Sequence, residues 1–294
     1  MIYLHHAGVL RFSLPLRDKL KKSCFVVKEE HDTIDDPLKY FVKIMKKNEP
    51  NIALVTGASK GIGHALVKEL IASGWKVVGV ARSKGPLNEM AKSYGEDLFI
   101  SHSCDVSDRE SVRFVSKSLR DKGIFPTLFF LNAGIAGEAA CEDVNNFTSK
   151  KHREIFDVNY FGVLHWVEEW VPVCQKFQGA RFVVTSSINA IFAPPTGSAY
   201  AASKAAIAKA FEGLALTYFN TNLNFSVVYS GPVATEGLKG NLPFTWDPKK
   251  MAKYVVKKTN KGESRIHNSL FYSWLARFLR ILPKKYTMKI LGSL

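Results

Sequence analysis

From residue 51 onward, short apolar clusters alternate with longer stretches of helical periodicity. The apolar clusters, rich in β-branched and aromatic residues, predict strands at Ile52–Val55, Lys76–Val80, Leu98–Ser101, Thr127–Leu131, Arg181–Thr185 and Asn224–Tyr229. The stretches between them predict helices at Ile62–Ser73, Arg109–Lys122, Lys151–Gln175 and Ser198–Asn220. Because strands alternate with helices, we expect right-handed crossovers and a parallel sheet covered on both faces. The pattern therefore predicts one doubly wound α/β domain over residues 50–268.

The stretch before this domain, residues 1–49, does not share its pattern. Pro50 ends the stretch, and Met45 would make a natural start for a domain whose first strand begins at Ile52. We predict that residues 1–49 are a poorly patterned N-terminal extension. Its first 44 residues are either loosely attached to the domain or an upstream start that is not always used.

The last segment, residues 269–294, is predicted to be basic and amphipathic. An apolar stripe recurs at positions i, i+3, i+4, i+7 and i+11, formed by Phe271, Trp274, Leu275, Phe278 and Leu282. Arg277, Arg280 and Lys284 occupy another face, and Pro283 is expected to end or kink the helix. Two interpretations remain open. Either residues 270–285 lie in a membrane interface, or the stripe packs back on the domain or on a second subunit.

Length and composition limit the class of protein. With 294 residues, 46% of them hydrophobic, the chain can bury one large core. Its four cysteines are scattered without a CxxC pair or a His/Cys cluster, which favours a reducing compartment and predicts no metal site. No apolar run approaches the ~20 residues needed to span a bilayer, and no secretory signal is evident. We therefore expect a cytoplasmic protein, with or without membrane association.

The net charge of +15 is concentrated toward the C-terminus. Residues 245–294 contain twelve Lys and Arg residues but only two acidic ones, Asp247 and Glu263. Such a basic end suits lipid headgroups, an acidic carrier protein or nucleic acid, although a solvated basic tail has the same composition. Because the chain has no recognised nucleic-acid-binding module, we predict no nucleic-acid partner.

A glycine-rich turn, TGASKGIG, joins the first predicted strand to the first predicted helix. Gly57 allows a tight turn, whereas Gly61 and Gly63 allow the backbone to approach a pyrophosphate at the helix N-terminus. Because the turn follows a strand and precedes a helix, its context predicts a nucleotide-binding site.

Tyr200 and Lys204 lie four residues apart, and Ser187 precedes the tyrosine by thirteen residues. On a helix, positions i and i+4 share a face, so the ammonium group is expected to sit beside the phenol. A nearby positive charge favours the phenolate and is expected to lower the pKa of Tyr200. This arrangement predicts a general acid/base.

Taken together, these motifs resemble the short-chain dehydrogenase/reductase family, which has a Rossmann fold, over residues 51–267. The resemblance rests on TGASKGIG, Asp105-Val106, Asn132-Ala133-Gly134, Asn159, Ser187, Tyr200-x-x-x-Lys204 and Gly231-Pro232-Val233-Ala234-Thr235. It implies catalysis by Ser187, Tyr200, Lys204 and Asn159, with Asn159 holding a relay water. It implies cofactor binding by Gly57, Ser59, Lys60, Gly61, Ile62, Gly63, Arg82, Ser83, Asp105, Val106, Asn132, Ala133, Gly134, Lys204, Pro232, Val233 and Thr235. Leu131 and Ser230 depart from the family's motifs, and we expect Leu131 to pack in the core.

The choice of cofactor depends on charge at the end of the second strand. An acidic residue there would bind the ribose 2′-hydroxyl of NAD, but the chain has Ala81 followed by Arg82. Lys60, in the glycine turn, adds a second cation. Two cations without a carboxylate predict NADP(H), because both can pair with a 2′-phosphate.

The expected function is hydride transfer between NADP(H) and a carbonyl or alcohol. The short segment Glu236–Pro248 and the apolar residues Phe192, Pro194 and Pro195 favour a small lipophilic substrate. The alternatives are a 3-oxoacyl-carrier reductase, whose acidic carrier would suit the basic surface, and a non-catalytic NADP-binding regulator. By analogy with the family, helices 151–175 and 198–220 predict a homodimer.

Overall fold

The computed structural model describes residues 3–4, 10–11, 51–136, 141, 145, 147–236, 238 and 242–291. The chain divides into two compact units, Met1–Ile44 and Met45–Leu294. In the first unit, β1 (Tyr3–Leu4) pairs antiparallel with β2 (Leu10–Arg11). The rest of the predicted extension lies outside the described residues, so its role stays a prediction.

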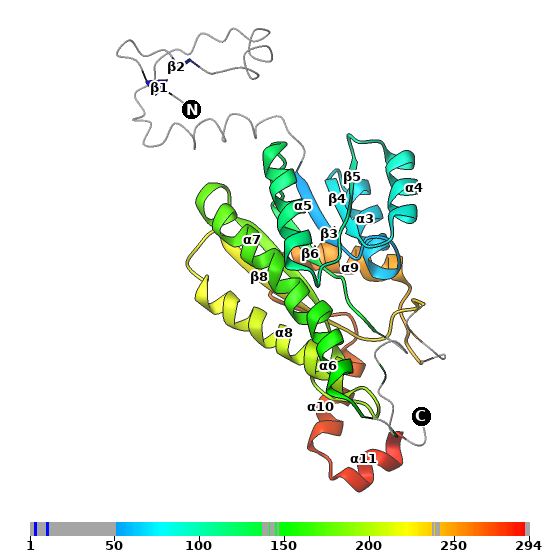
Figure 1. The fold of residues 1–294 in the computed structure, drawn as a ribbon. Coiled ribbons are helices and arrows are strands. Elements are labelled where there is room, and N and C mark those ends of the chain that lie inside the picture. Colours follow the sequence, from blue (N-terminus) through cyan, green and yellow to red (C-terminus); the bar gives the residue numbers. More distant parts are fainter. Residues whose placement is uncertain are drawn as a thin grey trace. The chain divides into compact units, whose positions relative to one another are not determined.

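The second unit contains a seven-stranded parallel sheet with the order β5-β4-β3-β6-β7-β8-β9 (Figure 1). Its strands are β3 (Ile52–Thr56), β4 (Lys76–Ala81), β5 (Phe99–Ser103), β6 (Leu128–Leu131), β7 (Ala180–Ser187), β8 (Leu223–Ser230) and β9 (Arg265–His267). The strand order reverses between β3 and β6. In open parallel sheets, ligands bind at such a switch point, beyond the carboxyl ends of the strands.

Helices cover both faces of the sheet. One face packs against α3 (Gly61–Ala72), α4 (Lys84–Tyr94) and α9 (Pro248–Asn260). The other face packs against α5 (Arg109–Asp121), α7 (Gly162–Phe177) and α8 (Ser198–Thr217). The remaining elements are α6 (Ser149–Phe156), the π-helical η2 (Asp157–Phe161), the 3-10 helix η3 (Ile188–Ala190), α10 (Leu270–Ile281) and α11 (Lys284–Leu291). The structure confirms the predicted doubly wound α/β fold.

Alternation along the strands explains why the sheet is buried on both sides. Phe129 points into the core beneath α5, α7 and α8, whereas its neighbour Phe130 points into the opposite core. The rings of Phe129, Phe182 and Phe225 stack across three adjacent strands, with centroids 4.6 and 5.2 Å apart. These contacts tie β6, β7 and β8 together. Leu131 is 1% exposed, as expected of a packing residue.

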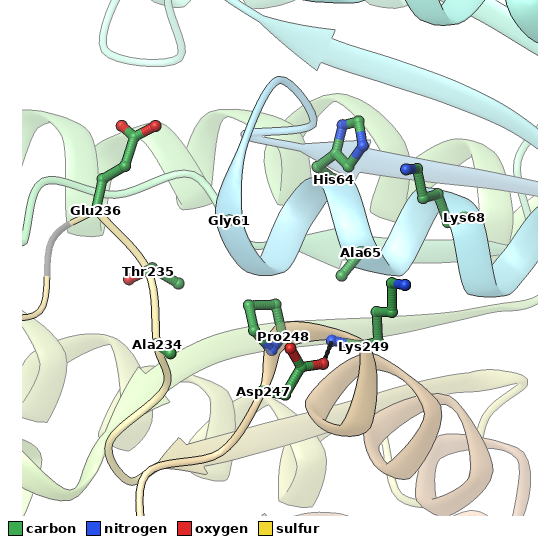
Figure 2. Close-up of a pocket in the computed structure, with 10 residues that line it drawn as sticks. All are labelled: Gly61, His64, Ala65, Lys68, Ala234, Thr235, Glu236, Asp247, Pro248 and Lys249. Carbon is green, nitrogen blue, oxygen red and sulfur yellow. Dashed lines mark hydrogen bonds between the residues drawn. The ribbon is translucent and has the colours of Figure 1, made fainter. Parts of the chain in front are cut away.

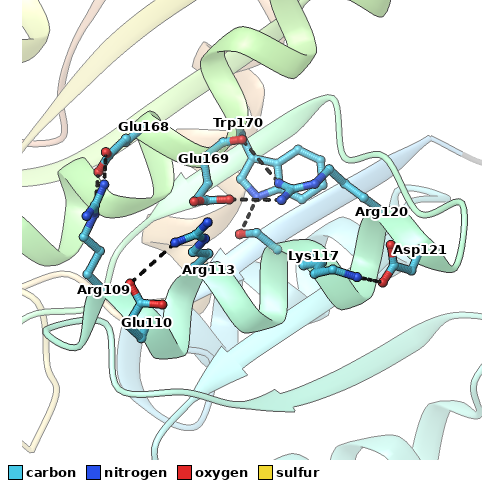
Figure 3. A network of polar contacts seen from close by, with 10 residues as sticks. Arg109, Glu110, Arg113, Lys117, Arg120, Asp121, Glu168, Glu169 and Trp170 are labelled. Carbon is cyan, nitrogen blue, oxygen red and sulfur yellow. Dashed lines mark hydrogen bonds and ion pairs between the residues drawn. The ribbon is translucent and has the colours of Figure 1, made fainter.

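Polar contacts hold α5 beside α7 (Figure 3). Arg109 pairs with Glu168 at 2.5 Å, and Arg120 pairs with Glu169 at 3.1 Å. The buried indole of Trp170 donates to the hydroxyl oxygen of Ser116 at 3.0 Å. Because the Arg109–Glu168 pair is exposed and screened by water, the buried Trp170 contributes more to this packing than that ion pair does.

The predicted helix over residues 151–175 is interrupted. It consists of α6, the π-helical turn η2 and α7. A π-helical turn widens the backbone locally and is common at functional sites. Here η2 contains Asn159, one of the candidate site residues.

Candidate active site

The glycine turn leads from β3 into α3 and leaves little room for a side chain at the positions of its glycines. Gly57 and Gly61 adopt φ values of 68° and 58°, a left-handed conformation that favours glycine. A Cβ on Gly63 would lie 2.1 Å from the carbonyl oxygen of Gly57. Lys60 precedes α3, and its side chain does not cap the helix because an ammonium group cannot accept a hydrogen bond. The first-turn N–H groups of α3 are therefore available to bind an anion, and the predicted nucleotide-binding role stays a prediction.

The segment after β6 lies against this turn. Thr56 accepts hydrogen bonds through Oγ1 from the backbone N–H groups of Asn132 and Ala133, both at 3.0 Å. A Cβ on Gly134 would come within 3.3 Å of the Nζ of Lys204. The segment thus joins the glycine turn to the candidate catalytic residues.

Ser187, Tyr200 and Lys204 meet at the carboxyl end of β7 and the start of α8. The side chains of Ser187 and Tyr200 are joined by a hydrogen bond. The Nζ of Lys204 lies 5.8 Å from the ring centroid of Tyr200 and donates to the carbonyl oxygen of Thr185 at 2.8 Å. A small apolar cluster that includes Ile135 packs around Tyr200. The predicted spacing therefore brings all three side chains to one site.

Burial is the largest cause of the pKa shifts of Tyr200 and Lys204. Burial raises the pKa of Tyr200, and the hydrogen bond with Ser187 offsets this only in part. Burial also lowers the pKa of Lys204 to about 8. The expectation that Lys204 would lower the pKa of Tyr200 is therefore wrong for this structure. The phenol is too well desolvated, and the ammonium group of Lys204 points to the carbonyl of Thr185.

Asn159 is fully buried, and its amide connects the segment after β6 to α8. Its Oδ1 accepts from the N–H of Ile135 at 2.7 Å. Its Nδ2 donates to the carbonyl oxygen of Ile135 and to the hydroxyl of Ser203, both at 3.1 Å. The side chain therefore positions the segment next to Lys204. The predicted role of Asn159 in holding a relay water is not tested by these contacts.

The candidate cofactor residues at the ends of β4 and β5 also lie together. Arg82 approaches Asp105 with 3.9 Å between NH1 and Oδ2. Burial raises the pKa of Asp105, but hydrogen bonds from Ser107 and the charge of Arg82 outweigh it, so the pKa is lowered overall. Ser83 precedes α4, and Val106 is buried. Arg82 is exposed and can reach a ligand at this edge.

The segment after β8 forms the opposite wall of the site. A Cβ on Gly61 would lie 3.3 Å from the Cγ2 of Thr235. Figure 2 shows Thr235 and Glu236 on the loop that faces Gly61. Lys60 and Glu236 form an ion pair at 2.6 Å between these two walls.

Two residues with a part in this wall were not found from the sequence. Asn268 is 5% exposed and accepts from the N–H of Gly231 at 2.7 Å, so it holds the turn that follows Ser230. Glu236 contacts Lys60 from 176 positions away. Neither residue lies in a recognisable motif, and only the tertiary fold brings it to the site.

The family model for short chain dehydrogenases matches residues 51–243. The chain belongs to the short-chain dehydrogenase family. All the motifs on which the resemblance rests lie within this match.

Two characterised short-chain dehydrogenase relatives show the extent of the similarity. The NADPH-dependent 1-acyldihydroxyacetone phosphate reductase of Saccharomyces cerevisiae is 32% identical over 65% of this chain and 64% of its own length. The 11-beta-hydroxysteroid dehydrogenase A of Sesamum indicum is 32% identical over 64% of this chain and 54% of its own length. The chain thus spans less than two thirds of each relative.

A solved structure shares the fold. The short-chain dehydrogenase of Burkholderia cenocepacia in complex with NADP superimposes with a TM-score of 0.70 at 23% identity. The match covers 83% of this chain and 98% of the other.

Proposed function

We propose that the protein transfers a hydride between NADP(H) and a carbonyl or alcohol substrate, with Tyr200 as the general acid/base. The observation that carries this proposal is the convergence of Ser187, Tyr200 and Lys204 beside Gly134, at the carboxyl edge of the sheet. A structural role alone does not require a hydrogen-bonded phenol and a buried amine at a ligand-binding edge.

The glycine turn and the segment after β8 would form the two walls of a cleft for a dinucleotide. Gly57, Gly61 and Gly63 leave the backbone open to a diphosphate, and a side chain at any of them would strain the turn or collide with it. Thr235 closes the other wall. The remaining residues that would hold the cofactor are Ser59, Ile62, Ser83, Asp105, Val106, Asn132, Ala133, Pro232 and Val233. When bound, the cofactor supplies the hydride.

Side chains of the protein would transfer the proton to and from the substrate oxygen. Tyr200 would donate its phenolic proton to the carbonyl oxygen during reduction and accept it during oxidation. Ser187 would donate a hydrogen bond to the same oxygen and stabilise its developing negative charge. Lys204 would bind ribose hydroxyls, which requires it to leave the carbonyl of Thr185. Asn159 would hold the relay water and keep Gly134 in place.

NADP(H) is favoured over NAD(H) by charge. Ala81 is buried and carries no carboxylate, whereas Arg82 and Lys60 are exposed. Both cations can pair with a 2′-phosphate. The yeast relative named above is NADPH-dependent, which agrees with this choice.

The substrate is proposed to be small and lipophilic, because the segment after Thr235 carries Phe244 and Trp246, and Trp246 pairs with Val233 in the wall of the site. We further propose a homodimer, since Leu216 and Phe219 are exposed near the end of α8. The chain is also proposed to contact a membrane peripherally through residues 270–285. A 3-oxoacyl-carrier reductase remains the second candidate, supported by the basic C-terminal region.

Cofactor fluorescence during titration with NADPH and NADH tests the binding half of the proposal. We expect NADPH to bind more tightly than NADH. Arg82→Ala should weaken NADPH binding about tenfold or more, because a charge-assisted contact to phosphate contributes about 1.5–3 kcal/mol. Arg113→Ala, an exposed arginine on α5, is the control. Failure of both cofactors to bind would overturn the proposal.

Turnover of lipophilic ketones tests the catalytic half. Tyr200→Phe should lower kcat by about 10²–10⁴-fold, because it removes the proton donor. Its NADPH affinity should be retained. Tyr218→Phe, near the end of α8, is the matched control. NADPH binding with equal turnover by wild type and Tyr200→Phe would point to another proton donor. NADPH binding without any turnover would favour the non-catalytic regulator.

A further inference from the structure

The helix α10 exposes a large apolar face. Leu270, Phe271, Trp274, Phe278 and Ile281 are 72, 54, 73, 50 and 78% exposed. At 3.6 residues per turn, these five side chains fall within an arc of about 100°. An exposed aromatic cluster of this kind is unusual on a free protein surface and marks an interaction site.

The helix is held to the domain by a different face. Ser273, Ala276 and Leu279 are buried, and Ser273 contacts the Nδ1 of His267 at 2.9 Å. α10 also lies against η3, directly after Ser187. The aromatic stripe predicted from the sequence is therefore only partly packed on the domain. Within the described residues, at least half of each of the side chains of Phe271, Trp274 and Phe278 is exposed.

The charge around this face has one sign. No Asp or Glu occurs after Glu263 in the sequence. The cations along and beyond α10 are exposed, namely Arg277, Arg280, Lys284, Lys285 and Lys289. α11 adds the exposed apolar residues Tyr286 and Met288. An aromatic face whose own helix and following segment carry only cations complements an anionic interface with an apolar interior.

The same face continues onto the segment after Thr235. Phe244 is 69% exposed, and its ring centroid lies 5.4 Å from that of Phe271. Tyr272 donates from its hydroxyl to the carbonyl oxygen of Pro243 at 2.7 Å. Further along, the backbone N–H of Trp246 donates to the carbonyl oxygen of Pro232 at 3.0 Å. α10 is thus tied, through this segment, to the wall of the candidate active site.

We propose that the face formed by Phe244, α10 and α11 docks on the surface of an anionic phospholipid bilayer. The aromatic side chains enter the interface, and the lysines and arginines meet the lipid headgroups. No helix in the described parts of the chain is both long and apolar enough to cross a bilayer, so α10 lies in the surface.

This docking turns the segment after Thr235 toward the lipid. If the proposed function holds, on which this consequence rests, a lipophilic substrate dissolved in the bilayer reaches the site beside Phe244. The proposal thus explains why the aromatic face adjoins the catalytic edge of the sheet rather than the opposite edge.

Vesicle flotation tests the docking without relying on catalysis. The full chain is mixed with vesicles of phosphatidylcholine, with or without phosphatidylserine. We expect it to float with the anionic vesicles. The double variant Trp274→Ala/Phe278→Ala should reduce the partition coefficient at least about tenfold, because it removes two aromatic side chains from the interface. Phe114→Ala, which alters an aromatic residue 74% exposed on α5, is the matched control and should float like wild type.

A second pair of variants tests the role of charge. Lys284→Gln/Lys285→Gln should weaken binding to anionic vesicles by about tenfold or more, at roughly 1 kcal/mol per lysine. Lys253→Gln/Lys257→Gln, on the exposed side of α9, should have little effect. Equal binding to neutral vesicles would overturn the electrostatic part of the proposal.

Two results would overturn the docking itself. One is recovery of the wild type in the soluble fraction with both kinds of vesicle. The other is a dimer that dissociates in Trp274→Ala/Phe278→Ala without any vesicle binding, which would assign the face to a second copy. NADPH titration of the same variants separates the two proposals. If the protein floated with vesicles but did not bind NADPH, the proposed function would be contradicted and the membrane docking would stand.

Discussion

At the residue scale, Lys204 combines a place in the candidate active site with a cost in stability. It is 5% exposed, and burial lowers the pKa of its ammonium group from 10.5 to about 8. The folded protein therefore binds fewer protons than the unfolded chain between those pH values. Burying the charged ammonium group lowers the free energy of unfolding by about 3 kcal/mol. This loss of stability is present in full below about pH 8 and disappears as the pH rises toward 10.5.

Lys204→Met should therefore be more stable than wild type near pH 7. We expect a gain of about 2 kcal/mol, because the relieved penalty is partly offset by the lost hydrogen bond to Thr185. Urea unfolding measures the gain, which should shrink by about 2 kcal/mol near pH 9.5. Lys253→Met, on exposed α9, is the control. A gain that does not change with pH would contradict the buried charge.

If Lys60 binds the cofactor as proposed, Glu236 would compete with the cofactor for it. The two side chains are 74 and 71% exposed and lie 2.6 Å apart. An exposed ion pair contributes at most about 1 kcal/mol, so Glu236→Gln should tighten NADPH binding by up to about fivefold. NADH binding should not change, because it has no 2′-phosphate. Glu110→Gln, which disrupts the exposed pair with Arg113, serves as control. Equal tightening of NADH would show that Glu236 acts on another part of the cofactor.

At the element scale, the glycine turn can be tested by adding one methyl group. Gly63→Ala would place a Cβ against the backbone oxygen of Gly57, which must then move. We expect a loss of about 1–3 kcal/mol in the free energy of unfolding, together with loss of NADPH binding. Urea unfolding and NADPH titration measure the two effects.

Gly213→Ala separates this effect from a general intolerance of alanine. Gly213 lies within α8, and a Cβ there would meet nothing within 4 Å. Alanine at that position should stabilise the helix by about 0.5–1 kcal/mol and leave NADPH binding unchanged. If both glycine variants behaved alike, the turn would not need its close backbone approach.

The elements also show what the sequence could predict. Six strands were found because buried parallel strands are continuous apolar runs. β9 has only three residues, too few for such a run, and was missed with the Asn268 that follows it. The break at η2 contains Asn159, whose contacts with Ile135 and Ser203 lie far apart in the sequence, so no local pattern indicates them. For α10, periodicity located the helix but not which face is buried.

At the scale of the whole molecule, the switch between β3 and β6 brings distant segments together. Residues 57–63 follow β3, residues 132–134 follow β6, and residues 231–235 follow β8. Motif order predicted the members of this site because each motif follows a strand whose carboxyl end lies at the same edge. The ion pair across the cleft and the contact of α10 with η3 depend on the assembled fold and could not be predicted.

Hydrogen exchange of the full chain tests this assembly. A bound dinucleotide would contact both walls of the cleft, so NADPH should slow amide exchange in residues 57–63 and in residues 231–236 together. The stabilisation should approach about 2.7 kcal/mol when NADPH is present at 100 times its Kd. The internal control is α5, which has no residue in the proposed cofactor site. Amides of α5 that exchange through local opening should have the same exchange rate with and without NADPH. Protection of residues 57–63 alone would mean that the segment after β8, with Thr235 and Glu236, is not part of the cofactor site. Protection of both would show that one ligand joins the two halves of the sheet.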